Sequence, residues 1–249
     1  MSPPATGSGD NYLYLLMHLP KTGGTTINAH RAEHLGFDDR FAHLGPWGNQ
    51  TREARGDPRV HDWPAERLER LRVISGHLVH ASVHQLVPGK TPRYFTFVRQ
   101  PAALAVSHYN HEASRVDDPP GFWEWYEARP PNTQVAAFEH QLGVVGIKEV
   151  TQRLKDFWYV GPTEWIDRDL PHILREIGVP TEFTNRRVAG GGADLADVWP
   201  PIQDVTIVRH QEMTDEISER VTERDALDAR LHTFAQHRSQ QLRQQYGWV

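Results

Sequence analysis

The sequence predicts an α/β fold in which helices cover both faces of a central, mainly parallel sheet, and three observations support this prediction. Short apolar runs of strand length alternate with longer segments whose apolar residues recur every three or four positions. The apolar runs are nearly continuous, as expected of strands buried on both faces of a parallel sheet. Motifs with polar and glycine residues directly follow these runs, where ligands bind in such sheets. We therefore expect a three-layer α/β/α architecture.

Strands and helices are expected in alternation along the chain. The apolar runs predict strands at 12–19, 71–78, 93–100 and 157–162. The helical spacing predicts helices at 24–35, 101–114, 133–142, 147–156 and 164–177. The alternation favours one domain over 11–249, although a chain of 249 residues is also long enough for two small ones.

A last long helix is expected to begin near Thr222. The run Thr222-Glu-Arg-Asp offers an N-cap hydroxyl followed three residues later by an acid. Leu227, Leu231 and Phe234 then repeat at three- and four-residue steps, which predicts an amphipathic helix.

Composition excludes several classes of protein. Residues 1–10 are rich in Pro, Gly and Ser and lack the features of a signal peptide, so we expect a disordered segment there. The net charge of −5 gives no support for nucleic-acid binding, and the absence of cysteine excludes disulfides and thiolate sites. No run approaches the roughly 20 apolar residues that a membrane span needs. We therefore expect a cytoplasmic protein without a membrane span.

The stretch HLPKTGGTT, residues 18–26, predicts an anion-binding loop between a strand and a helix. Glycines allow close approach of the backbone, and the first N–H groups of a helix attract anions. Lysine adds a positive charge and threonine adds hydroxyl donors. A plain turn with a solvated lysine is the alternative, but the combination favours the anion site. The candidate ligands are Lys21, Thr22, Gly23, Gly24, Thr25 and Thr26. The order of residues differs from a Walker A loop, in which the lysine follows the glycines.

Several motifs resemble those of PAPS-dependent sulfotransferases. HLPKTGGTT is similar to the 5′-phosphosulfate loop of that family, in the form found in the heparan sulfate 2-O/6-O and related carbohydrate branches. FVRQPAALAVSHYNH (97–111) is similar to the 3′-phosphate segment, with Arg99 and Ser107 at the matching positions. ISGHLVH, PNTQVAAFEHQLG and YVGPTEWIDRDL resemble three further segments, in the same order along the chain. The chain has Gln100 and Leu104 where the family usually has Asp and Arg.

The resemblance implies a P-loop-like fold and transfer of a sulfuryl group from 3′-phosphoadenosine 5′-phosphosulfate (PAPS), which releases PAP. The acceptor would be a hydroxyl of a small molecule, a lipid or a carbohydrate. Lys21 would stabilise the leaving phosphate, and Arg99 with Ser107 would bind the 3′-phosphate. His77 would be the general base, because imidazole titrates near neutral pH and the family has a histidine there. His80 is the nearest rival.

Other interpretations remain open from the sequence. His77, His80 and His84 have helical spacing, but no carboxylate lies among them, so no metal site is expected. Arg186 and Arg187 lie in a glycine-rich stretch that either closes over the 3′-phosphate or is a solvated loop. The aromatic stretch 121–132 is more typical of a packed helix than of a stacking platform. A P-loop-like nucleotide kinase and a non-catalytic nucleotide- or glycan-binding protein are the alternative functions.

Overall fold

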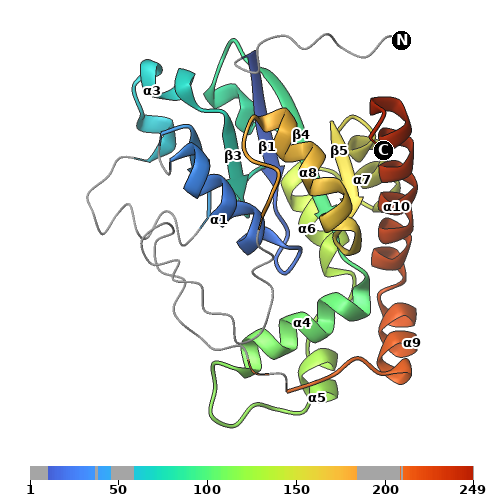
Figure 1. Cartoon of the computed structure of the whole chain (residues 1–249). Helices are drawn as coiled ribbons and strands as arrows, with labels where there is room; N and C mark the ends of the chain where they lie inside the picture. Colours follow the sequence, from blue (N-terminus) through green and yellow to red (C-terminus); the bar gives the residue numbers. More distant parts are fainter. Residues whose placement is uncertain (1–10, 37–38, 46–58, 184–207, 209, 249) are drawn as a thin grey trace.

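The centre of the molecule is a five-stranded parallel sheet with the strand order β2-β3-β1-β4-β5 (Figure 1). The strands are β1 Tyr12–Met17, β2 Phe41–His43, β3 Val73–Gly76, β4 Thr91–Val98 and β5 Tyr159–Pro162. This computed structural model describes residues 11–36, 39–45, 59–183, 208 and 210–248. The predicted segments 12–19, 71–78, 93–100 and 157–162 each overlap a strand, although β4 begins two residues before the predicted 93. The three-residue β2 is too short for a pattern to predict.

Helices cover both faces of this sheet. On one face lie α1 (Gly24–Leu35) and α8 (Ile166–Ile177), and on the other lie α6 (Thr133–Leu142) and α7 (Ile147–Leu154) (Figure 1). The long helix α10 (Ala226–Tyr246) runs along β5 at the edge of the sheet. The predicted three-layer α/β/α architecture is therefore confirmed.

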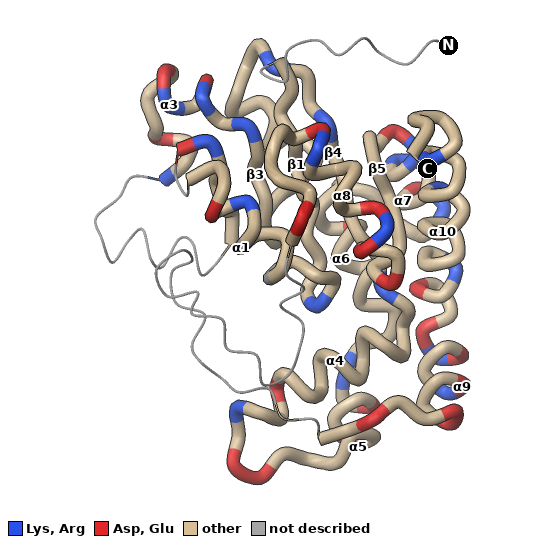
Figure 2. Tube along the Cα trace, viewed as in Figure 1, with Lys and Arg blue, Asp and Glu red and all other residues tan. Residues whose placement is uncertain are grey.

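Strand β1 shows why the central strands are apolar throughout. Leu13 and Leu15 belong to the core under α6 and α7, whereas Tyr14 and Leu16 belong to the core under α1 and α8. Successive side chains of a strand point to opposite faces, so a strand between two helical layers must be apolar at every position. Figure 2 shows charged residues over the helices and loops but none in β1. Over the described ranges, no helix is both long and apolar enough to cross a membrane.

Three helices form a smaller cluster beyond the ends of the strands. They are α4 (Pro101–Ala113), α5 (Phe122–Glu127) and α9 (Asp215–Arg224) (Figure 1). Phe122 and Tyr126 of the aromatic stretch are buried there, and Phe122 lies edge-on against Tyr109 of α4. These rings are therefore core residues of a packed helix. Within the described residues, the remaining short elements are α3 Ala65–Arg70 and the 3₁₀ turns Val60–Asp62, Val83–Leu86 and Thr163–Trp165.

The predicted start of the last helix at Thr222 is wrong. Thr222 lies inside α9, whose N-cap is Thr214, the side chain of which accepts a hydrogen bond from the backbone N–H of Ile217. The chain leaves helical geometry at Asp225, and α10 begins one residue later. Asn132 caps α10 through space, because its Oδ1 atom accepts from two backbone N–H groups in the first turn. A cap that comes from a distant residue leaves no local sequence signal.

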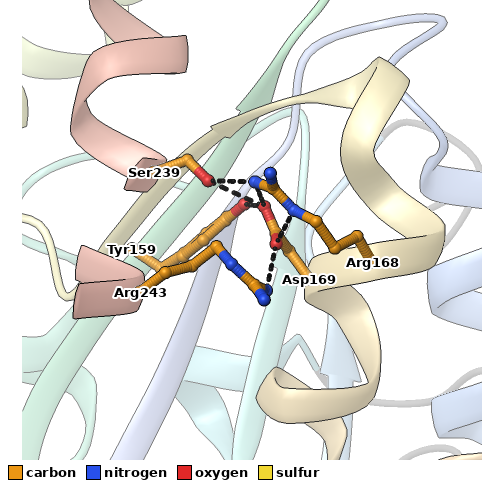
Figure 3. A network of polar contacts seen from close by, with 5 residues as sticks. All are labelled: Tyr159, Arg168, Asp169, Ser239 and Arg243. Carbon is orange, nitrogen blue, oxygen red and sulfur yellow. Dashed lines mark hydrogen bonds and ion pairs between the residues drawn. The ribbon is translucent and has the colours of Figure 1, made fainter. Parts of the chain in front are cut away.

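A buried carboxylate joins α8 and α10 to β5 (Figure 3). Asp169 of α8 is fully buried and accepts hydrogen bonds from the Tyr159 hydroxyl at 2.6 Å and the Ser239 hydroxyl at 2.8 Å. The guanidinium groups of Arg168 and Arg243 add bonds of 2.7 to 3.0 Å. The hydrogen bonds from Arg168, Tyr159 and Ser239 outweigh burial, which alone would raise the pKa of Asp169, and hold that pKa below its ordinary value. A charged carboxylate therefore connects three elements.

Candidate active site at the ends of the central strands

Three candidate residues lie at the carboxyl ends of three neighbouring strands. His77 directly follows β3, Lys21 lies in the loop after β1, and Arg99 directly follows β4. Since β3, β1 and β4 are adjacent and parallel, these positions share one edge of the sheet. In α/β proteins of this kind, ligands bind at that edge.

The loop between β1 and α1 has the backbone geometry expected of an anion site. Lys21 and Gly23 have positive φ values of 63° and 86°, and α1 begins at Gly24. The N-cap residue is Gly23, which has no side chain to cap α1, and the N-terminus of a helix attracts anions. Thr22 is buried and its hydroxyl donates to the carbonyl of Leu19 at 2.8 Å, which fixes this side chain within the loop. Thr26 is also buried, and the Thr25 side chain lies outside the described part.

Gly24 is required because the imidazole of His18 lies directly beneath the loop. A Cβ atom on Gly24 would lie 2.0 Å from Nε2 of His18. The His18 ring is buried, and its Nδ1 atom is 3.4 Å from the hydroxyl of Thr22. Burial and the neighbouring His77 keep the pKa of His18 well below its ordinary value, so this ring is neutral. The second glycine of the motif therefore makes room for the histidine that begins it.

Gly24→Ala is expected to lower the free energy of unfolding by about 1–3 kcal/mol, the usual cost of overpacking a close-packed site. Denaturant unfolding followed by circular dichroism measures this change. Gly121→Ala is the matched control, because a Cβ atom there meets no atom within 4 Å. Its cost should stay below about 1 kcal/mol, as for a glycine N-cap replaced by alanine. Equal stability of the two variants would contradict the packing of His18 under the loop.

His77 is held in the tautomer that a general base needs. Its Nδ1 atom lies 3.0 Å from the backbone carbonyl of His18, which can only accept, so Nδ1 carries the proton. Nε2 is then the basic nitrogen. Burial lowers the pKa of His77, and the hydrogen bond to the His18 carbonyl opposes this effect. The imidazole rings of His77 and His18 are stacked with their centroids 4.6 Å apart.

The other two histidines after β3 have different partners. Nδ1 of His80 lies 3.0 Å from the hydroxyl of Ser82, and Nδ1 of His84 lies 3.0 Å from the hydroxyl of Tyr94. His80 is exposed, unlike His77. Among the residues with described positions, no three His, Cys, Asp or Glu side chains gather as metal ligands.

Positive charge concentrates around the loop. The guanidinium Nη1 of Arg99 donates to the carbonyl of Lys21 at 2.8 Å, which joins the ends of β1 and β4. Burial, with the charges of Arg99 and Arg115, lowers the pKa of Lys21 to about 8. Lys21 is therefore still mostly protonated at pH 7, in a setting where a bound anion would relieve repulsion among the cations.

Helix α4 faces the same loop. The pKa values of His108 and His111 are lowered by burial and by the charge of Lys21, and that of His111 falls to about 4. Ser107, which directly precedes His108 in α4, is half-buried and has no side-chain hydrogen bond within the described ranges. Gln100 caps this helix by accepting from the N–H of Ala103 at 2.7 Å.

The sequence did not predict roles for Arg115, Gln134 or Gln141, which the structure places in or beside the site. Gln134 and Gln141 hydrogen-bond the backbones of Arg99 and His77, respectively. The sequence signal for Gln134 was its position in PNTQVAAFEHQLG, one of the segments that resemble the sulfotransferase motifs. Arg186 and Arg187 lie outside the described residues.

Comparisons with known proteins find similarity at the level of the three-dimensional structure. No protein-family model matches the chain, and no curated protein matches it significantly. The crystal structure of a sulfotransferase from Alicyclobacillus acidocaldarius is similar with a TM-score of 0.46 and 14% identity, over 90% of this chain and 95% of that chain.

Proposed function

We propose that the protein is a sulfotransferase that uses PAPS as donor and a hydroxyl group as acceptor. The observation that carries this proposal is the joint position of two cationic groups and a neutral imidazole at three adjacent strand ends. Lys21 and Arg99 are in contact through the 2.8 Å hydrogen bond to the Lys21 carbonyl, and His77 follows the strand on the other side of β1. The motif resemblances assign the same residues to the two anionic ends of PAPS and to the base.

Each group then has a distinct part in the reaction. PAPS supplies the sulfuryl group, and its 5′-phosphate is the leaving group. Lys21 and the N-terminus of α1 stabilise the charge that grows on the leaving oxygen. Arg99 binds the 3′-phosphate through a planar set of donors, with Ser107 as a second donor. Nε2 of His77 takes the proton of the acceptor hydroxyl, while Nδ1–H stays bonded to the His18 carbonyl.

The acceptor class is proposed from the chemistry of the base and from the form of the loop motif. A histidine base suits an alcohol, whose proton must be removed as the oxygen attacks. The form of the loop motif favours a carbohydrate hydroxyl, and small-molecule or lipid hydroxyls fit the same chemistry. We propose cytoplasmic action on such a molecule.

Thermal unfolding with added nucleotides tests this function. A ligand that binds only the folded state stabilises it by about 2.7 kcal/mol at 100 times its Kd, so PAP should raise the melting temperature clearly. ATP and ADP should have little effect, since they lack the 3′-phosphate. Stabilisation by ATP with Mg²⁺ to the same extent would favour a nucleotide kinase. Sulfation of hydroxyl acceptors is measured by mass spectrometry. A protein that binds PAP but sulfates none of them would be a non-catalytic binding protein.

The Arg99→Ala variant makes this test residue-specific. Loss of a charge-assisted hydrogen bond typically costs about 1.5–3 kcal/mol, so the Kd for PAP should rise roughly 10- to 150-fold in calorimetry. Arg153→Ala on the exposed side of α7 is the control for loss of one positive charge. Unchanged affinity in Arg99→Ala would remove Arg99 from the 3′-phosphate site.

A further inference from the structure

We propose that helix α6 is the positioning helix of this site: Gln134 fixes the backbone that carries Arg99, and Gln141 fixes the backbone that carries His77. This inference rests on the proposed function only for what the two positioned residues do. The positions themselves follow from hydrogen bonds between described residues.

The side-chain amide of Gln134 bonds both the backbone N–H and the backbone carbonyl of Arg99. Its Oε1 atom accepts from the backbone N–H of Arg99 at 2.9 Å, and its Nε2 group donates to the backbone carbonyl of Arg99 at 2.8 Å. Arg99 lies just after β4, where the strand pairing has ended. A side-chain amide is the group that offers an acceptor and a donor together, so it replaces the missing strand partner. The Gln134 side chain is only 2% exposed, which leaves water little access to either bond.

Gln141 holds the segment that begins with His77. Its Nε2 group donates to the backbone carbonyl of His77 at 3.1 Å, and its own backbone carbonyl accepts from the N–H of Ala81 at 3.0 Å. Both ends of the short segment from His77 to Ala81 are therefore attached to the last turn of α6. The ring of His77 is then oriented by its bond to the His18 carbonyl.

Helix α6 can position both Arg99 and His77 because an α-helix repeats every 3.6 residues. Gln134 and Gln141 are seven residues apart, about two turns, so their side chains lie on the same face of α6. Phe138, between them on that face, is fully buried in the core under the sheet. The first turn of α6 is anchored in turn, since the carboxylate of Asp228 accepts from the N–H of Gln134 at 3.0 Å and from the next N–H at 2.8 Å. A rigid helix therefore sets the spacing between the two strand ends.

Gln134→Met and Gln141→Met test the proposal, because methionine keeps the length of glutamine and removes the amide. Gln152→Met on the exposed side of α7 is the matched control. Hydrogen–deuterium exchange should show faster uptake around Arg99 in Gln134→Met and around 77–81 in Gln141→Met, each without change at the other segment. In calorimetry and kinetics, Gln134→Met should raise the Kd for PAP about 10-fold, the effect of losing paired hydrogen bonds. Gln141→Met should leave that Kd within about 2-fold and lower kcat by roughly 3- to 10-fold.

The outcomes separate this proposal from the proposed function. A wild-type protein that does not bind PAP would contradict the function, while the exchange pattern would still decide the positioning. If both variants lower the melting temperature but exchange at the two segments stays at the wild-type rate, α6 has a purely structural role and the proposal is wrong. An equal loss of PAP affinity and of kcat in both variants would also overturn it, since the two amides would then not act on separate residues.

Discussion

His77→Ala is expected to lower kcat by roughly 10²- to 10⁴-fold, the usual cost of removing a general base. Affinity for PAP and the free energy of unfolding should stay close to wild type, because among the described residues the imidazole has a single hydrogen-bond partner, the His18 carbonyl. Steady-state kinetics of sulfuryl transfer, with calorimetry of PAP binding, measure the two quantities separately.

The pH profile identifies which group carries this effect. Burial lowers the pKa of His77, so log kcat/KM should rise with pH and level off with a midpoint below the ordinary histidine value of about 6.5. In the proposed mechanism Lys21, with a pKa of about 8, acts on the leaving group in its protonated form, so kcat/KM should fall again above that pH. The His77→Ala variant should lose the acid limb and keep the alkaline limb.

His80→Ala is the control for this assignment. His80 is exposed and its Nδ1 atom is bonded to Ser82, so its loss should leave turnover within about 2-fold of wild type. Turnover that survives in His77→Ala and falls in His80→Ala would move the base to His80. If neither variant is impaired, the acceptor is acidic enough to need no base, as a phenol would be.

Asp169→Ala is expected to give the largest loss of stability, about 3–5 kcal/mol, as for the removal of one partner from a buried ion pair. The variant leaves the buried hydroxyl groups of Tyr159 and Ser239 without their acceptor and leaves Arg168 and Arg243 without their counter-ion (Figure 3). Differential scanning calorimetry should show a melting temperature lower by roughly 6–20 °C, at about 2–4 °C per kcal/mol for a chain of this size.

Asp167→Ala on the same helix is the matched control for Asp169→Ala. Asp167 is exposed in the first turn of α8, where an acid contributes about 0.3–1 kcal/mol through the helix dipole. The pH dependence gives a second test. The folded-state pKa of Asp169 lies below its ordinary 3.8, so its contribution is present above that pH and is lost as pH falls through the folded-state value. If the acid unfolding of Asp169→Ala coincided with that of the wild type, the role of this carboxylate would be contradicted.

Local patterns were enough to predict the elements that bury one regular face. Helices α1, α4 and α6 begin at the predicted residues and end within one residue of the predicted ends, because apolar spacing and flanking glycine or proline both mark them. The loop between β1 and α1 was predictable for the same reason, since strand, lysine, glycines and helix are contiguous. The start of α10 was not predictable, because its cap, Asn132, lies more than 90 residues away in the sequence.

The sequence by itself determined that this chain forms an α/β sheet, with a loop of lysine, threonine and glycine after the first strand and an arginine after another. Only the tertiary structure decided that His77, Lys21 and Arg99 lie at adjacent strand ends. The order of the strands in the sheet, β3-β1-β4, differs from their order along the chain. The tertiary structure also decided why Gly24 is a glycine and why Gln134 and Gln141 are buried amides. Gly24 contacts His18, Gln134 bonds Arg99 and Gln141 bonds His77, in each case across the fold. Hydrogen bonding and steric exclusion act over a few ångströms, whatever the separation along the chain.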